Sequence, residues 1–238
     1  MRPVRLHSVS YAHPGQAPLF QDLSWEAAPG TITALVGASG CGKSTILRLV
    51  AGLIHPAQGE ITVPEGDRAF VFQSPTLLPW RTVGDNVGLP LELRGTPRAE
   101  RAPRVAEALA RVGLAETTDL LPRQLSGGMR MRASLARALV TQPALLLLDE
   151  PFSALDPITR RRLQLEFLGW WSSLRFTALL VSHDIDEAVW MADRVLVLAG
   201  RPARVVADVA IDLPRPRDPA LLHEPALGAL TRQVEAAL

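Results

Sequence analysis

One glycine-rich stretch constrains this chain more than any other feature of its sequence. It follows the apolar residues 31–36, precedes the helix-forming residues 45–50, and reads Gly37-Ala38-Ser39-Gly40-Cys41-Gly42-Lys43-Ser44. This spacing predicts a phosphate-binding loop, in which backbone N–H groups surround phosphate oxygens at a helix N-terminus. We expect Lys43 to reach the β- and γ-phosphates, and the Ser44 hydroxyl to bind Mg²⁺. A glycine turn with a chance lysine is the alternative, but it does not account for the strand and helix on either side.

Two residues inside this stretch are each the only one of their kind in the chain. Lys43 is the sole lysine, and a compact ammonium group suits a phosphate cradle better than the planar fork of arginine. Cys41 is the sole cysteine, so the chain cannot form an intrachain disulfide, and we expect a reducing compartment. We interpret Cys41 as a small neutral filler of the loop. A catalytic thiol is the alternative, but the neighbouring sequence offers no base for it.

Composition and charge narrow the class of protein. The chain has 238 residues, of which 47% are hydrophobic, enough for a substantial core. Its formal net charge of +1 argues against a nucleic-acid partner, and the one obvious basic cluster, residues 160–162, is interpreted as a solvated helix face. The N-terminus lacks the apolar region of a signal peptide, and no apolar run approaches the roughly 18 residues of a membrane helix. We therefore expect a cytoplasmic protein that reaches a membrane only through partner chains.

The pattern of apolar residues predicts an α/β fold. Residues 4–11 and 19–25 alternate as in an antiparallel hairpin, and short strands are expected at 59–63 and 68–72. The middle of the chain is expected to be helical, with turns and short helical pieces over 73–95 and helices at 98–112 and 126–140. Strands and helices then alternate as in a parallel sheet, at residues 144–148, 157–174, 177–182, 185–192 and 194–198. From residue 211 we expect a surface arm with a terminal helix.

Two carboxylates stand at the end of a predicted buried strand. Asp149 and Glu150 follow four consecutive leucines, at the position where an open parallel sheet binds its ligand. We expect Asp149 to hold Mg²⁺ directly or through water. Glu150 would polarise the water that attacks the γ-phosphate. A strand that simply ends in acidic residues is the alternative, and the phosphate-binding loop makes it the weaker one.

A second anion site is predicted at Ser126-Gly127-Gly128, just before a helix pattern. Free N–H groups and the helix dipole point outward at such a position. The bare pattern is weak by itself. Two phosphate-binding elements and one nucleotide are best explained by head-to-tail pairing of two chains, with each ATP between the loop of one chain and the Ser-Gly-Gly of the other.

In this order, the motifs resemble those of the nucleotide-binding subunit of an ATP-binding cassette (ABC) transporter. The resemblance covers nearly the whole chain and implies ATP, Mg²⁺ and an ATP hydrolase. It also implies a P-loop NTPase parallel-sheet core with an N-terminal antiparallel β subdomain and an inserted α-helical subdomain at about residues 74–140. We expect residues 1–210 to form one such domain and residues 211–238 a short extension.

The resemblance assigns roles to four further residues. Tyr11 corresponds to the aromatic residue that stacks on adenine, although a strand tyrosine in the core is the alternative. Gln73 corresponds to the glutamine that senses Mg²⁺ and the attacking water. Asp156 belongs to the segment that crosses between protomers, and His183 to the switch that contacts the γ-phosphate and orders Glu150. The nucleotide ligands expected in all are Tyr11, Gly37, Ala38, Ser39, Gly40, Cys41, Gly42, Lys43, Ser44, Thr45, Ser126, Gly127, Gly128 and Asp156.

One residue departs from the pattern of the family. Related proteins usually follow the Ser-Gly-Gly motif with glutamine, whereas this chain has Met129. In the resembled mechanism, Ser126 and the backbone of the two glycines make the phosphate contact. We therefore expect ATPase activity to survive.

The segment over residues 77–87 resembles the corresponding segment of ATPase subunits in nitrate, sulfonate and taurine importers. It would line the groove that receives a membrane subunit, and Trp80 is the exposed aromatic expected there, unless it folds back on the core of its own chain. The implied partners are a second cassette, most simply in a homodimer, permease subunits bound through residues 74–90, and an extracytoplasmic solute-binding protein. The implied location is the inner face of the cell membrane.

Other functions share the same chemistry. The ATPase of an exporter or of a lipid-trafficking system is the main alternative, since only the segment after Gln73 distinguishes it. A soluble ABC ATPase that acts on DNA or ribosomes would carry long coiled-coil insertions or tandem cassettes, and this chain has neither. A P-loop kinase or switch that acts alone would need neither the Ser-Gly-Gly motif nor His183.

Overall fold

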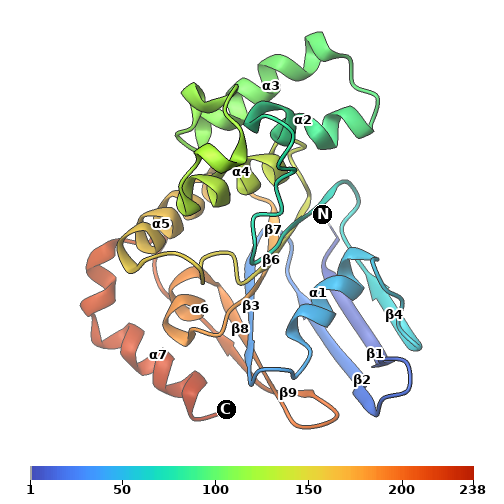
Figure 1. The fold of residues 1–238 in the computed structure, drawn as a ribbon. Helices are drawn as coiled ribbons and strands as arrows, with labels where there is room; N and C mark the ends of the chain where they lie inside the picture. The colour runs from blue at the N-terminus through green and yellow to red at the C-terminus, as the bar shows by residue number, and fades with distance from the viewer. Residues whose placement is uncertain (1) are drawn as a thin grey trace.

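The computed structural model describes residues 2–238 and contains two β-sheets (Figure 1). The smaller sheet is antiparallel and has the strand order β2-β1-β4. Its strands are β1 (Val4–Ala12), β2 (Pro18–Ala27) and β4 (Gln58–Thr62). The predicted hairpin is therefore present, with the predicted short strand added on the free side of β1.

The larger sheet has six strands in the order β5-β6-β7-β3-β8-β9. Strands β5, β6, β7, β3 and β8 run parallel to one another, and β9 pairs antiparallel with β8. The bounds are β3 (Ile32–Gly37), β5 (Arg68–Val71), β6 (Leu145–Asp149), β7 (Thr177–Val181), β8 (Arg194–Ala199) and β9 (Arg204–Ala210).

The central strands are continuous apolar runs because the sheet is covered on both faces. Leu146 and Leu148 of β6 belong to the core on one face, whereas Leu145 and Leu147 belong to the core on the other. This alternation follows from the two-residue period of a strand. The second core also contains the apolar residues of the small sheet and of helix α1 (Lys43–Ala51), so that α1 is enclosed between the two sheets.

The helices α2, α3 and α4 gather in a lobe at one end of the molecule, far from the small sheet (Figure 1). Their bounds are α2 (Val83–Leu93), α3 (Arg98–Arg111) and α4 (Gly127–Leu139). Three further helices lie against the larger sheet, namely α5 (Pro157–Leu174), α6 (Ile185–Met191) and the terminal α7 (Pro225–Glu235). Short 3-10 turns occupy Ala115–Thr117, Pro122–Gln124 and Pro219–His223. Within residues 2–238, no helix is both long and apolar enough to cross a membrane.

Two features differ from the sequence-based expectation. The expected short pieces over 73–95 include one continuous helix, α2, which runs through Pro90. Its buried Val83, Val87 and Leu91 hold it against the core, so tertiary packing outweighs the cost of the proline. Strand β9 was not predicted. It is an edge strand paired only with β8, and most of its residues are partly or fully exposed, which leaves a weak apolar pattern.

Candidate nucleotide-binding site

The predicted site residues come from one edge of the larger sheet. The phosphate-binding loop follows β3, Gln73 lies shortly after β5, Asp149 ends β6, and His183 lies shortly after β7. These four strands are parallel neighbours, so their carboxyl ends meet at the same edge. Strand order thus brings together residues that lie far apart in the sequence.

The loop requires glycine at two positions for steric reasons. Gly42 has a φ of 100°, and a Cβ atom there would lie 2.4 Å from Cζ of Phe20. A Cβ atom on Gly37 would lie 2.3 Å from the carbonyl oxygen of Leu198. Both distances are far below van der Waals contact, so a side chain at either position would displace the loop or the residues packed against it. The glycines therefore let the backbone pass close to strands β2 and β8.

Lys43 is folded back into the loop. Its Nζ donates hydrogen bonds to the carbonyl oxygens of Gly37, at 2.7 Å, and Ala38, at 3.1 Å. The residue is only 7% exposed. The ammonium group is thus held at the inside of the turn, where it can meet an anion that the backbone N–H groups surround.

Ser44 and Asp149 form the candidate magnesium site. The Ser44 hydroxyl donates a 2.8 Å hydrogen bond to Oδ1 of Asp149. Burial raises the pKa of Asp149 above its ordinary value of 3.8, partly offset by that hydrogen bond, and the charge of Glu150 raises it further. A hydroxyl and a carboxylate are hard oxygen ligands, and Mg²⁺ normally takes only one or two protein carboxylates together with phosphates and water. The donor set therefore fits the ion that the sequence predicted.

Glu150 is the point on which the other polar residues converge. Its Oε2 lies 3.2 Å from Nε2 of Gln73, which donates to it, and 3.1 Å from Nδ1 of His183. Gln73 also donates to the hydroxyl of Ser153 at 3.3 Å. Glu150 has a φ of 47°, an unusual conformation for a residue with a side chain, and its N–H donates to the carbonyl of Val181. Strain of this kind is typical of functional sites.

A cavity of about 670 Å³ opens over the loop. It is lined by nine of the predicted residues, namely Gly37, Ser39, Gly40, Gly42, Lys43, Ser44, Thr45, Glu150 and His183. His13, Gln16 and Leu19, which we did not predict, line it too. They come from the turn between β1 and β2 and the start of β2. The sequence marks this turn with Pro14 and Gly15, but nothing in it indicates that the turn would face the loop.

Three further predicted ligands, Tyr11, Cys41 and Ala38, do not line this cavity. Tyr11 contacts it through His13, since the Tyr11 hydroxyl lies 3.4 Å from Nδ1 of His13 and the two rings meet edge to face. Cys41 is buried in the core beneath the loop, as expected of a small filler. Ala38 contributes its carbonyl to Lys43. The stacking role of Tyr11 stays a prediction.

The Ser-Gly-Gly motif and Asp156 do not take part in the cavity over the phosphate-binding loop of their own chain. Ser126 begins α4, and its hydroxyl accepts from the N–H of Met129 at 3.2 Å. Asp156 begins α5, and its carboxylate accepts from the N–H of Thr159 at 3.0 Å, which lowers the pKa of Asp156. Ser126 and Asp156 are both exposed, and neither lines the cavity over the loop. Their outward position is the one that an opposing chain could reach.

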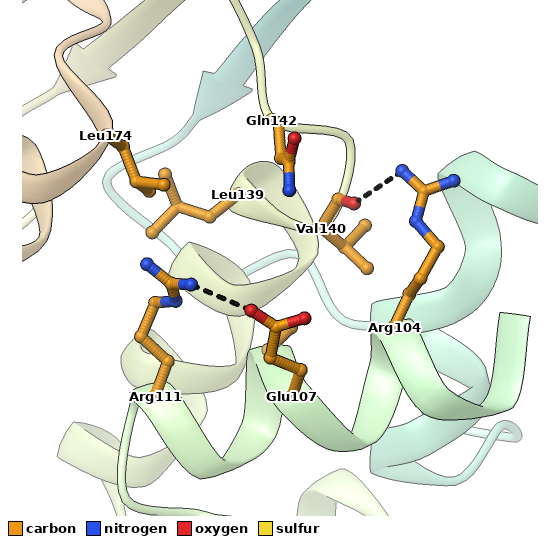
Figure 2. Close-up of a pocket in the computed structure, with 8 residues that line it drawn as sticks. Arg104, Glu107, Arg111, Leu139, Val140, Gln142 and Leu174 are labelled. Atoms are coloured by element: carbon orange, nitrogen blue, oxygen red, sulfur yellow. Dashed lines mark hydrogen bonds and ion pairs between the residues drawn. The ribbon is translucent and has the colours of Figure 1, made fainter.

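A further cavity in the helical lobe does not make a second site (Figure 2). It has a volume of about 30 Å³, room for about one water molecule. Its two arginines are already engaged, Arg104 with the carbonyl of Val140 and Arg111 with Glu107. Each guanidinium is thus already oriented by one of these bonds, and a space for about one water molecule leaves no room for a larger ligand.

Comparison with known proteins decides the family. The profile described as ABC transporter matches residues 20–153. The chain belongs to the ABC transporter family. The aliphatic sulfonates import ATP-binding protein SsuB 1 of Xanthomonas axonopodis pv. citri (strain 306) is 46% identical over 233 residues, 94% of this chain and 92% of that one. The aliphatic sulfonates import ATP-binding protein SsuB of Granulibacter bethesdensis (strain ATCC BAA-1260 / CGDNIH1) is 49% identical, covering 91% and 87%.

Solved ABC structures share the fold. The ATP-binding cassette MJ0796, in a dimeric post-hydrolysis state bound to ADP and Pi, has a TM-score of 0.76 and 27% identity, and covers 88% of this chain and 99% of its own. The cbiO1 protein from Clostridium perfringens, part of the ABC transporter complex cbiONQ, has a TM-score of 0.79 and 26% identity, and covers 87% and 88%. The predicted ABC ATPase fold is therefore confirmed, and the chain is an ABC ATPase.

Proposed function

We propose that this ABC ATPase powers the import of a small anionic nutrient of the sulfonate class through a membrane permease. The convergence of Gln73 and His183 on Glu150, beside Lys43 and Ser44, carries the proposal for the chemistry. The proposed direction and substrate class are supported by the relatives that are named as aliphatic sulfonate import proteins.

In the proposed reaction, Glu150 accepts a proton from the water that attacks the γ-phosphate of ATP. His183 and Gln73 hold the Glu150 carboxylate from two sides, which limits the orientations it can take. Lys43 and the loop N–H groups bind the phosphates. Mg²⁺ held at Ser44 and Asp149 would neutralise part of the phosphate charge. Gln73, which donates to Glu150, would lie near both the ion and the attacking water.

The proposed site is completed by a second copy of the chain. Ser126, Gly127 and Gly128 lie on the N-terminal end of α4, where free N–H groups favour a phosphate. In the pairing we propose, they close the far side of the ATP bound to the partner's loop, with Asp156 at the crossing between protomers. The dimeric state described for MJ0796 supports this arrangement.

The proposed permease contact follows Gln73. Trp80 is 73% exposed, an unusual position for so large an apolar side chain. A cavity of about 340 Å³ lies in the helical lobe, lined by Thr82 and by residues of α2 and α3 such as Gly88, Arg101 and Val105. We propose that permease subunits bind through residues 74–90, which would hold the chain at the inner face of the membrane. An extracytoplasmic solute-binding protein would deliver the nutrient, and no nucleic acid takes part.

The proposal is tested by transport in a reconstituted system. The chain is placed in liposomes with the permease and the solute-binding protein that we propose as its partners, and ATP-driven uptake of a radiolabelled alkanesulfonate, taurine and nitrate is compared. We expect uptake of one of these anions and none with Glu150→Gln. Trp80→Ala should abolish uptake while the isolated chain keeps its ATPase rate. ATP-driven export, or uptake that is insensitive to Trp80→Ala, would contradict the proposal.

A further inference from the structure

The three consecutive arginines near the start of α5 do not share one solvent-exposed face of the helix. The interpretation made from the sequence is wrong for Arg160 and Arg161, which are both half-buried, whereas Arg162 is exposed. Arg161 places its guanidinium over the ring of Trp190 in α6, 4.9 Å from the centroid. Arg162 pairs with Glu166 one turn along its own helix, at 3.1 Å. Arg160 makes a different set of contacts.

Arg160 binds the backbone of the loop that follows Glu150. Its Nε donates to the carbonyl of Phe152 at 3.2 Å, and its Nη2 donates to the carbonyls of Ser153, at 3.3 Å, and Leu155, at 3.0 Å. One guanidinium thus satisfies three carbonyls of a single short loop. A lysine ammonium could not reproduce this geometry, because its donors radiate from one atom, whereas those of arginine are spread over a planar fork.

The same guanidinium faces the switch segment. Nη1 of Arg160 lies 3.9 Å from Oδ2 of Asp184, the residue that follows His183 and caps α6. The loop on the other side contains Ser153, whose hydroxyl accepts from Gln73 and donates to the carbonyl of Glu150. Arg160 therefore lies between the two segments that surround Glu150, and none of its contacts is with the residues that line the nucleotide cavity.

The helix itself gives no reason for a cation at this position. Arg160 donates its backbone N–H to Asp156, so it lies in the first turn of α5. Positive charge is unfavourable at a helix N-terminus because of the helix dipole. The carbonyls of residues 152, 153 and 155 and the carboxylate of Asp184 supply the negative charge that compensates for it. The placement is explained by these contacts and not by helix stability.

We propose that Arg160 is a positioning residue for ATP hydrolysis, which holds the loop over residues 152–155 against the segment that carries His183. This inference rests on the roles that we propose for Glu150 and His183. When Arg160 is removed, the loop and the switch lose their common anchor, so Glu150 is oriented less well. Binding of ATP changes little, because Lys43, Ser44 and the loop N–H groups are untouched.

The test compares Arg160→Met, Arg160→Lys and Arg162→Met in steady-state ATP hydrolysis by the purified full-length chain, at concentrations where it dimerises. We expect Arg160→Met to lower kcat by about tenfold to a hundredfold, since small displacements in a site have effects of this size. The KM for ATP and the affinity for a fluorescent ATP analogue should stay within about twofold of the wild type, a margin well below the loss expected in kcat. The control variant is Arg162→Met, on the same helix but with a side chain that is 76% exposed. It should leave kcat, the KM for ATP and the affinity for the analogue close to those of the wild type.

Arg160→Lys distinguishes the effect of the planar guanidinium from the effect of its positive charge. It also keeps the inference testable if Arg160→Met does not fold. We expect Arg160→Lys to remain impaired in kcat, because it keeps the charge but cannot bind three carbonyls. A wild-type kcat in Arg160→Lys, a loss in Arg160→Met equal to that in Arg162→Met, or a rise in KM at unchanged kcat would each overturn the inference. Glu150→Gln is measured alongside. Full activity in that variant would instead refute the proposed role of Glu150.

Discussion

The hydroxyl of Ser44 donates a hydrogen bond to Oδ1 of Asp149 at 2.8 Å, although 105 positions separate the two residues. Ser44 lies in the first turn of helix α1 after strand β3, and Asp149 ends strand β6. Strand β7 lies between β3 and β6 in the sheet, so the two side chains meet across a neighbouring strand. This pair joins the phosphate-binding loop to the acidic end of β6.

Asp149→Asn should weaken binding of the Mg²⁺ ion that we assign to Ser44 and Asp149. The amide lacks the negative charge that a hard cation prefers, and it still accepts the hydrogen bond from Ser44. We expect the Mg²⁺ concentration for half-maximal ATP hydrolysis to rise by about tenfold to a hundredfold. Binding of a fluorescent ATP analogue in EDTA should not change. A similar loss of analogue binding in EDTA would mean that Asp149 supports the loop and not the metal.

Glu150→Gln should bind ATP, form the ATP-dependent dimer and hardly turn over. The amide keeps the size of the side chain but cannot accept a proton from water, and removing a general base typically lowers the rate by about 10²–10⁴-fold. Hydrolysis is measured by phosphate release, and dimer formation by size-exclusion chromatography with ATP. The matched control is Glu116→Gln, an exposed glutamate of the helical lobe, which should behave like the wild type. Hydrolysis at the wild-type rate in Glu150→Gln would remove Glu150 from its assigned role.

Met129→Gln should change ATP hydrolysis by no more than a few fold. Met129 is half-buried and packs against the main core, while the exposed Ser126 and Gly127 present the N-terminal end of α4. Its N–H already caps the helix by donating to Ser126, and this bond does not depend on the side chain. Turnover of the two purified proteins is compared at equal dimer concentration. A large gain in Met129→Gln would show that the methionine limits catalysis.

Arg217→Met should destabilise the chain by about 1–3 kcal/mol, the cost of leaving buried polar groups without a partner. The Arg217 guanidinium is buried in the C-terminal extension, where burial lowers its pKa to about 10. It donates to the carbonyls of Trp190, at 3.1 Å, and Ala192, at 2.7 Å, at the end of α6. The free energy of unfolding is measured in urea. Arg232→Met on the exposed side of α7 is the control, and an equal loss there would contradict a specific role for Arg217.

Glu187→Gln should change how stability depends on pH. Glu187 is buried, accepts from Gln164 at 2.7 Å and from Ser182 at 2.5 Å, and burial raises its pKa above the ordinary 4.5. The folded chain therefore binds this proton more tightly than the unfolded chain, so the wild type loses stability as the pH rises above 4.5. Because the variant does not titrate there, the stability of the wild type relative to Glu187→Gln should fall as the pH rises over that range. Urea unfolding of both proteins at several pH values measures this difference, and a constant difference would contradict the prediction.

Much of the site could be predicted from the sequence because its parts are local. The glycines, Lys43 and Ser44 stand together in one loop whose geometry depends on backbone conformation and small side chains. The four leucines before Asp149 identify a strand buried on both faces. His13 and strand β9 were missed for the opposite reason: the first is a polar residue in a turn, the second an exposed edge strand, and neither has a distinctive local pattern.

The sequence by itself determined the phosphate-binding loop, the alternation of strands and helices in the core, and the family. Only the tertiary structure decided which residues meet: Gln73 and His183 with Glu150, and Arg160 with both the loop after Phe152 and Asp184. The physical reason is that spacing along the chain specifies backbone conformation and burial, whereas these contacts depend on the order of strands in the sheet and on where each helix packs. Three adjacent arginines look alike in the sequence, yet Arg161 meets Trp190 of α6, Arg160 faces Asp184, and Arg162 pairs with Glu166 of its own helix.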